Sequence, residues 1–239
     1  MTYQATFQRY EMKYLLDSHQ KEQILRAMEP CMKLDAYGRT TIRNIYFDTD
    51  SFRLIRRSLE KPVYKEKLRV RSYKKTEPGD PVFVELKKKY RSVVYKRRMT
   101  MPEDQASDCF RTGTALPADS QIAREIDYFR GFYGPLYPAV FLSYEREAFC
   151  SIDGSDFRVT FDENILYREQ DMGLGDEIYG IPLLKKGQTL MEIKTSGGIP
   201  LWMSAVLTGN RLYQTSFSKY GAAYSCMAAG ERKGGLRYA

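Results

Sequence analysis

Lysine and arginine recur at every second position in several short segments of the sequence. The clearest set is Lys65, Lys67, Arg69 and Arg71. Alternate residues of a β-strand point to the same face, so these four side chains would form one cationic row. Arginine grips phosphate oxygens through a planar fork, and lysine acts as a mobile point charge. The spacing therefore predicts a strand that binds a polyanion.

Carboxylates stand among these cations at the same spacing. A glutamate precedes a lysine by two positions in Glu11/Lys13, Glu85/Lys87 and Glu192/Lys194. Because Mg²⁺ is usually held by one or two carboxylates plus phosphate oxygens, such pairs suit a metal ion beside an anion site. Each carboxylate could instead orient a neighbouring lysine or arginine. A plain solvated sheet face is the commonest cause of alternation, but the charge mixture favours a built site.

Period-two patterns predict the strands that would carry these residues. The expected strands are 8–15, 40–48, 64–73, 82–89, 93–101, 139–150, 157–162 and 189–195. Helices are expected at 17–29, with an Asp17/Gln20 capping box, and at 51–59, 120–133, 200–207 and 219–229. The strand faces opposite the charges are apolar, so helices can cover them. We therefore predict an α+β fold: a closed antiparallel β-barrel of about eight strands, with a charged lumen and flanking helices.

Composition limits the class of protein. The 239 residues carry a net charge of +8, and 17 Lys or Arg against five acids fall between Arg53 and Arg98. This local excess predicts a phosphate-bearing ligand. We expect one domain over 1–239, with a loose tail after about 230. The absence of an apolar span or signal peptide predicts a soluble cytoplasmic protein, and four scattered cysteines predict buried reduced thiols without a zinc site.

Ten segments, in order, resemble a known family. They are YEMKYLL, NIYFDTD, KLRVRSY, VELKKK, YKRR, SYEREAF, RVTFD, LMEIKT, IPLW and SFSKYG, and they cover roughly Tyr10 to Gly221. This series resembles the polyphosphate polymerase domain of the vacuolar transporter chaperone (VTC) family, which belongs to the triphosphate tunnel metalloenzymes beside the CYTH-type triphosphatases. The resemblance implies a tunnel of antiparallel strands that binds a linear chain of phosphates. It also implies transfer of the γ-phosphate of ATP to polyphosphate, with release of ADP.

The same resemblance assigns roles to individual residues. It implies phosphate-contacting catalytic cations at Lys13, Arg69, Arg71, Lys87, Lys96, Arg146, Arg158, Lys194 and Lys219. Further phosphate contacts are implied at Lys89, Arg98, Tyr144 and Ser218. Glu192 matches the metal-binding glutamate for Mn²⁺ or Mg²⁺, while Glu11 and Glu85 are weaker metal candidates and Asp162 is expected to orient a cation.

One position departs from the wider superfamily. CYTH-type enzymes begin with ExExK, whereas this chain has Arg9 in place of the first glutamate of the stretch that ends at Lys13. The loss of one carboxylate favours a transferase over a hydrolase that must activate water. A tunnel triphosphatase and a non-catalytic module that binds polyphosphate or RNA remain as alternatives.

The resemblance also bears on partners. ATP and inorganic polyphosphate are the expected ligands, and nucleic acid is not expected. Eukaryotic relatives join this domain to membrane spans. This chain has none, so we expect that a separately encoded membrane protein could hold it at the inner face of a membrane.

Overall fold

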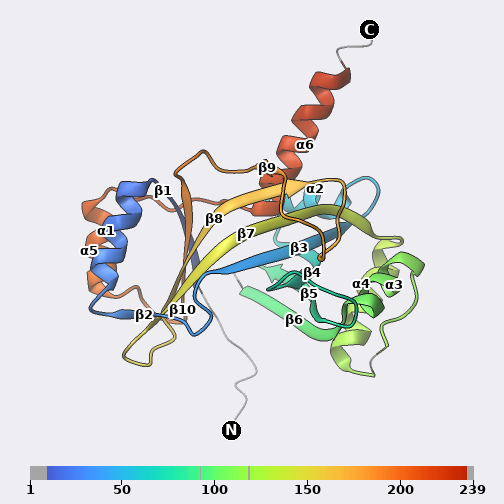
Figure 1. The fold of residues 1–239 in the computed structure, drawn as a ribbon, viewed down its shortest axis with the longest axis horizontal. Helices are drawn as coiled ribbons and strands as arrows, with labels where there is room; N and C mark the ends of the chain where they lie inside the picture. The colour runs from blue at the N-terminus through green and yellow to red at the C-terminus, as the bar shows by residue number, and fades with distance from the viewer. Residues whose placement is uncertain (1–9, 92, 118, 236–239) are drawn as a thin grey trace. The chain divides into compact units, whose positions relative to one another are not determined.

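The computed structural model describes residues 10–235 apart from 92 and 118, and of residues 231–235 it describes the backbone. The strands are β1 (Tyr10–Leu16), β2 (Met32–Leu34), β3 (Thr40–Asp48), β4 (Tyr64–Ser72), β5 (Pro81–Tyr90), β6 (Val93–Pro102), β7 (Tyr137–Ser151), β8 (Arg158–Arg168), β9 (Ile181–Pro182) and β10 (Thr189–Thr195). The helices are α1 (Ser18–Met28), α2 (Arg53–Leu59), α3 (Glu103–Thr112), α4 (Gln121–Tyr133), α5 (Leu201–Gly209) and α6 (Lys219–Gly235). Figure 1 labels them along the chain.

All eight expected strands and all five expected helices are present, with shifted ends. The first strand was expected from residue 8, but residues 8 and 9 lie outside the described residues. Strands β2 and β9 were not predicted, because three and two residues are too short to show a period. Helix α3 was also not predicted. It follows β6 directly and buries Ala106, Cys109 and Phe110 at helical spacing. Because the alternating pattern of β6 runs up to the first residue of the helix, no break in the pattern marks where α3 begins.

The chain divides into two compact units. The first comprises residues 1–41, 144–165 and 184–217. Here β10 pairs antiparallel with both β1 and β8. The apolar side chains of these strands pack with α1 and α5, which lie against each other (Figure 1). The expected capping box begins α1. The Asp17 side chain accepts a hydrogen bond from the backbone N–H of Gln20 at 2.8 Å, and the Gln20 side chain accepts one from the backbone N–H of Asp17 at 3.0 Å.

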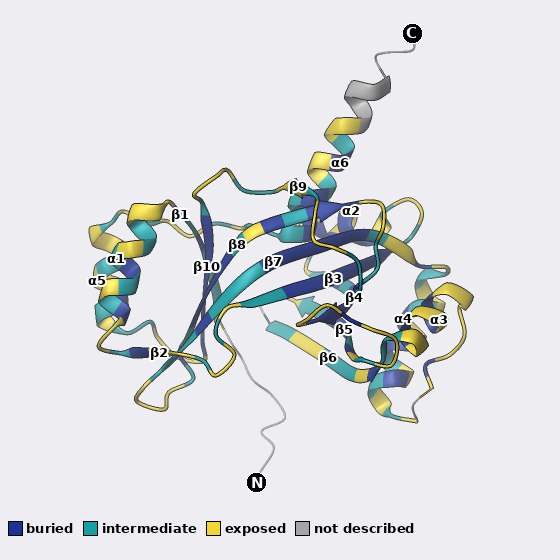
Figure 2. Cartoon of the chain, in the orientation of Figure 1, coloured by how far each residue is buried: buried dark blue, intermediate teal, exposed yellow. Residues whose placement is uncertain are grey.

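The second unit comprises residues 42–143, 166–183 and 218–239. Its strands β3, β4, β5 and β6 pair in sequence order. Leu68, Val84 and Leu86 on one sheet face are fully buried in a core that includes side chains from α2, α3 and α4. Figure 2 shows the inner sides of these elements in dark blue and the outer sides of the helices in yellow. The predicted apolar face is therefore confirmed for the central parts of β4 and β5, while Glu66 and Lys88 place charges at the ends of the same face.

The sheet is antiparallel in its described ladders, and it is open. Its strand order is β1-β10-β8-β7-β3-β4-β5-β6, with β2 paired to β7 and β9 to β8. Among the described residues no ladder joins the end strands β1 and β6, so the expected closed barrel of about eight strands is not confirmed. The edge of β1 that does not pair with β10 already accepts a backbone hydrogen bond. Thr215 N donates to Lys13 O at 2.7 Å, and a covered edge does not recruit another strand.

Two further expectations concern the C-terminal tail and the cysteines. A loose tail was expected after about residue 230, but α6 continues to Gly235, and residues 236–239 lie outside the described residues. The four cysteines are free thiols, but only Cys109 is buried; Cys31 and Cys150 are half-buried and Cys226 is exposed, so the expectation of burial is confirmed for Cys109 alone. None of the described helices combines the length and the apolar character that a bilayer crossing requires.

Candidate functional site

Glu192 is the centre of a charged cluster in the first unit, which we call the Glu192 cluster (Glu11, Lys13, Arg146, Asp162, Glu192 and Lys194). The Glu192 side chain is buried. Its Oε1 lies 3.4 Å from Lys13 Nζ, and its Oε2 lies 3.1 Å from Lys194 Nζ. Lys13 stands directly opposite Glu192 in the β1/β10 ladder, so the register produces this contact. Cations therefore approach both oxygens of the carboxylate.

Arg146 joins this cluster from β7. Its Nη2 lies 3.5 Å from Glu192 Oε2, and it also binds Asp162 of β8 through Nε–Oδ1 at 2.6 Å and Nη2–Oδ2 at 2.7 Å. Burial opposes the positive charge, but the Asp162 carboxylate outweighs burial and raises the pKa of Arg146 well above its ordinary value. The ring of Tyr144 lies 5.2 Å from the guanidinium carbon. Arg146 is thus a fixed, permanently charged group.

Glu11 supplies a second carboxylate to the cluster. It lies 3.3 Å from Lys13 Nζ, the same ammonium that contacts Glu192. Two carboxylates therefore converge on one point, which fits the donor set of a Mg²⁺ or Mn²⁺ ion whose other ligands come from phosphate and water. Within the described part of the chain, no three or more His, Cys, Asp or Glu side chains are grouped so that they could hold a metal ion.

Arg158 pairs with a carboxylate that lies outside the Glu192 cluster. It faces Lys194 across the β10/β8 ladder, and its Nη2 lies 3.2 Å from Asp35 Oδ2. Asp35 follows the short strand β2, which sequence patterns did not reveal. The structure therefore places Arg158 at the same sheet face as Lys194 but ties it to a loop carboxylate.

Glu85 is the centre of the corresponding group in the second unit, the Glu85 cluster (Arg69, Arg71, Glu85, Lys96 and Arg98). Its side chain is 1% exposed. Arg69 Nη2 lies 2.7 Å from Oε2, while Lys96 Nζ at 2.8 Å and Arg98 Nε at 2.6 Å approach Oε1. The register explains the arrangement, because Arg69 and Arg98 face Glu85 from the two neighbouring strands. The cations bind Glu85 at 2.6–2.8 Å, closer than the 3.1–3.5 Å found at Glu192, which suits an orienting role for Glu85 better than a metal ligand.

The electrostatics of this cluster follow from its burial. Burial works to raise the pKa of Glu85, but the charges of Arg69, Arg71 and Lys96 hold that pKa well below its usual range. Burial lowers the pKa of Lys96 to about 8, against the attraction of Glu85. Glu85 therefore stays ionised across the physiological range, whereas Lys96 loses its proton at mildly alkaline pH.

A row of three lysines runs beside the Glu85 cluster. Lys67, Lys87 and Lys96 face one another across β4, β5 and β6. Like charges directly opposite each other in a sheet repel, so an anion at this row would relieve the repulsion. Lys67 Nζ donates to Ser218 Oγ at 2.9 Å, immediately before Lys219 starts α6. Lys89 faces Lys65 one step along the same sheet face.

Some contacting residues are absent from the set that the resemblance assigned. Lys67 is one, although its alternation with Arg69 places it on the same strand face. Tyr46 and Tyr73 are others, since their hydroxyls accept from Arg69 Nη1 and Arg98 Nη2, both at 2.8 Å. Arg71 Nε donates to Asn44 Oδ1 at 2.8 Å. Spacing within one strand indicates Lys67 but cannot reveal Tyr46, Tyr73 and Asn44, because their contacts join residues of different strands or loops.

Trp202 and His19 belong to neither cluster. Trp202 packs its ring edge-to-face with Phe157, with centroids 5.9 Å apart, which is a helix-to-sheet contact. His19 is exposed at the start of α1. Arg9, which replaces the first glutamate of the ExExK pattern, lies outside the described residues.

Comparison with solved structures supports the fold. A Bacillus halodurans protein provisionally assigned as an adenylate cyclase matches with a TM-score of 0.54 at 15% identity, over 88% of this chain and 95% of that one. A similarly assigned Vibrio parahaemolyticus protein gives 0.48 at 10% identity, over 92% and 99%. A Pyrococcus horikoshii OT3 protein gives 0.36 at 11%, over 84% and 87%. At these identities, the first match shows a shared fold and nothing about activity.

Comparison with protein families is more specific. No curated protein matches this chain by sequence. The model of the VTC domain family matches residues 8–228, which include every residue of the two clusters. The matched region also contains the ten segments on which the resemblance rests. The chain therefore belongs to the VTC domain family.

Proposed function

We propose that this protein is a metal-dependent polyphosphate polymerase. In the proposed reaction, a terminal oxygen of polyphosphate forms a bond to the γ-phosphorus of ATP. The bond from that phosphorus to the β–γ bridging oxygen breaks, and ADP leaves with the electron pair. ATP and inorganic polyphosphate, rather than nucleic acid, are the ligands in this proposal. Membership of the VTC family and the charged clusters support it.

The observation that carries the proposal is the environment of Glu192. Lys13, Arg146 and Lys194 lie 3.1–3.5 Å from this buried carboxylate, and Glu192, Glu11 and Asp162 together balance their three charges. A divalent ion bound here would therefore give the cluster the net positive charge that a phosphate group needs. Phosphoryl transfer depends mainly on positioning and on neutralising charge around the transferred group. Arg146 is held by Asp162 and can bind a phosphate oxygen without first being ordered. The lysines can follow a phosphate chain as it moves.

The Glu85 cluster supports the same function from the second unit. Glu85 fixes Arg69, Lys96 and Arg98 on one sheet face, so their direction is set before any ligand binds. Such preorganised cations act on phosphate charge without reorganisation at the moment of reaction. The adjacent row of Lys67 and Lys87 extends the cationic surface. We propose that these residues hold phosphate groups of ATP or polyphosphate.

Glu11 and Glu192 are the residues that we propose to hold the divalent ion. A bound Mg²⁺ or Mn²⁺ would supply neutralising charge to phosphate oxygens. Lys13, which touches both carboxylates, would then be free to bind phosphate itself. Glu85 is a weaker candidate because Arg69, Lys96 and Arg98 already bind it at 2.6–2.8 Å, whereas the cations around Glu192 lie 3.1–3.5 Å away.

The state of the carboxylates favours transfer over hydrolysis. Glu11, Glu85, Asp162 and Glu192 each contact at least one lysine or arginine. A carboxylate paired with cations is a weak base, whereas a hydrolase needs a group that can take a proton from water. The replacement of the first ExExK glutamate by Arg9 points the same way. Together these features favour polymerase activity over triphosphatase activity.

One assay tests this proposal against both alternatives. The full chain is incubated with ATP and Mn²⁺ or Mg²⁺, and long-chain polyphosphate, ADP and free phosphate are resolved over time. Polymer and ADP formed together support the polymerase. Free phosphate without polymer would support a triphosphatase instead. Binding of ATP or polyphosphate without any turnover would reduce the protein to a binding module.

A further inference from the structure

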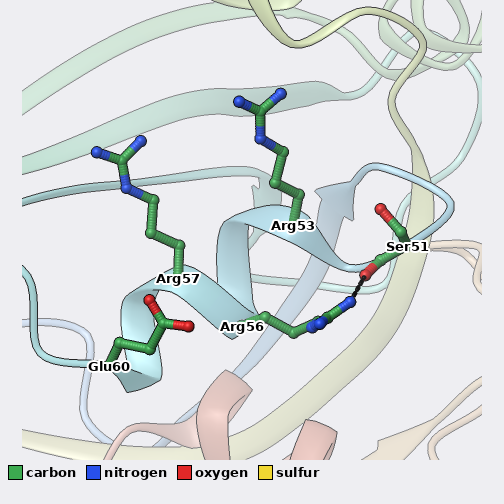
Figure 3. Close-up of a pocket in the computed structure, with 5 residues that line it drawn as sticks. All are labelled: Ser51, Arg53, Arg56, Arg57 and Glu60. Carbon is green, nitrogen blue, oxygen red and sulfur yellow. Dashed lines mark hydrogen bonds between the residues drawn. The ribbon is translucent and has the colours of Figure 1, made fainter.

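The outer side of α2 carries a basic pocket that neither cluster includes. It has a volume of about 330 Å³ and is lined by Ser51, Arg53, Arg56, Arg57 and Glu60 (Figure 3). Helix α2 packs through Leu54, which shares a core with Leu68 and Val70 of β4. Those residues alternate with Arg69 and Arg71 along the strand, so α2 covers the face opposite the Glu85 cluster. The pocket is therefore separate from that cluster.

Arg53 and Arg57 point the same way from this helix. They are four residues apart, and Figure 3 shows their guanidinium groups extending side by side, while Arg56 turns away toward the carbonyl of Ser51. Like charges at this spacing destabilise a helix. Within the described part of the chain, no carboxylate lies within ion-pair distance of either side chain. The two positive charges thus share one space without a counter-ion from the described residues.

Neighbouring side chains hold Arg53 in position without cancelling its charge. Its guanidinium carbon lies 5.5 Å from the ring centroid of Tyr133. The Tyr133 hydroxyl donates to Glu66 Oε2 at 2.9 Å, and the Tyr64 hydroxyl donates to Oε1 at 2.5 Å. Glu66 is buried, and both of its oxygens are engaged by these tyrosines. Glu66 is thus engaged by the aromatic support, and among the described residues no ion pair joins Glu60, which lines the pocket, to Arg53 or Arg57.

Two parallel guanidinium groups match the geometry of a phosphate group. Each can donate two parallel N–H bonds to phosphate oxygens, and a dianion balances both charges. We propose that Arg53 and Arg57 form a phosphate-binding site on the outer side of α2. The phosphate is carried either by a soluble compound or by a lipid headgroup. This site is additional to the proposed polymerase and does not depend on it.

Side-chain NMR can test the site even though phosphate compounds also bind elsewhere. The Nε–Hε signals of Arg53 and Arg57 are assigned from Arg53→Gln and Arg57→Gln, and the full chain is titrated with inorganic pyrophosphate. We expect both signals to shift with one saturable curve. The signal of Arg111, an exposed arginine paired with Asp108 on α3, should move much less. The double variant lacks both of these signals, so its binding is followed by the Nε–Hε signal of Arg56, which also lines the pocket, and should be at least tenfold weaker.

Vesicles distinguish the two sources of phosphate. Sedimentation is measured with vesicles of phosphatidylglycerol and phosphatidylcholine, and with phosphatidylcholine alone. The matched control is the Arg111→Gln/Arg124→Gln variant, which removes two exposed charges of the same unit. Sedimentation lost in Arg53→Gln/Arg57→Gln but kept in the control assigns a lipid headgroup, and saturable NMR shifts without sedimentation assign a soluble ligand. The proposal is overturned if Arg53 and Arg57 shift no more than Arg111 and the double variant sediments like the control.

Discussion

Arg146 and Asp162 form a two-point ion pair, with Nε–Oδ1 at 2.6 Å and Nη2–Oδ2 at 2.7 Å, and Asp162 is fully buried. The pair links β7 to β8 directly beside Glu192. It fixes the plane of the guanidinium while Nη2 still reaches Glu192 at 3.5 Å. Asp162 therefore positions Arg146, which is the orienting role expected for it from the sequence.

Loss of the Asp162 charge should destabilise the fold and the site together. In Asp162→Asn the buried Arg146 loses its main counter-ion, so we expect the free energy of unfolding to fall by about 3–5 kcal/mol. Urea denaturation measures this change. Asp119→Asn removes an exposed partner of Arg124 and should cost no more than about 1 kcal/mol. Equal losses in the two variants would show that the Arg146–Asp162 pair contributes no more to the free energy of unfolding than the exposed Arg124–Asp119 pair.

Substitution of Glu192 should separate turnover from binding. We expect Glu192→Gln to lower the rate of polymer synthesis by at least about 100-fold, because the proposed metal loses its main ligand. ATP binding, measured by calorimetry, should persist because Lys13, Arg146 and Lys194 remain. The control is Glu22→Gln, an exposed glutamate paired with Arg26 on α1. Wild-type turnover in folded Glu192→Gln would refute the metal assignment.

Affinity for phosphate should decrease as Lys96 loses its proton. Burial lowers the pKa of Lys96 to about 8 in the folded protein, from an ordinary value of 10.5. At pH values between these two pKa values, Lys96 is more fully protonated in the unfolded chain than in the folded protein. Its contribution to the free energy of unfolding therefore rises with pH. Phosphate binding moves in the opposite direction, because the site loses a positive charge. We expect the Kd for inorganic triphosphate to increase from pH 7 to pH 9.

An arginine at position 96 provides the check on this pH dependence. Lys96→Arg keeps its charge throughout the range and should flatten the increase in Kd, as measured by calorimetry at each pH. Lys186→Arg, at an exposed turn position, should retain the wild-type profile. The interpretation fails if the Lys96→Arg and wild-type profiles coincide.

Lys67 should contribute to phosphate affinity although the family resemblance did not assign it. It faces Lys87 in the ladder and donates to Ser218 Oγ at 2.9 Å. A charge-assisted hydrogen bond contributes ~1.5–3 kcal/mol, so Lys67→Gln should raise the Kd for triphosphate about tenfold or more. Lys88→Gln is the matched control, because Lys88 belongs to the opposite face of β5 and lies near Glu66. An equal effect of both substitutions would mean that only net charge matters.

The sequence by itself determined which side chains share a strand face. Alternation is a property of the extended backbone, so the common face of Lys67, Arg69 and Arg71 followed without any tertiary information. The same holds for the charged residues Glu192 and Lys194 on β10, and for the Asp17 cap of α1. Ordered motifs along the chain were also sufficient to identify the VTC family.

Only the tertiary structure decided which charges meet. The register of β1 against β10 brings Lys13 to Glu192, Arg146 reaches Glu192 from β7, and the register of β4, β5 and β6 brings Arg69 and Arg98 to Glu85. Register depends on packing and turns between residues far apart in the chain, so a single-strand pattern cannot supply it. The open sheet and the α2 pocket depend on the same kind of non-local contact. For that reason the sequence predicted a closed barrel and did not predict the pair Arg53 and Arg57.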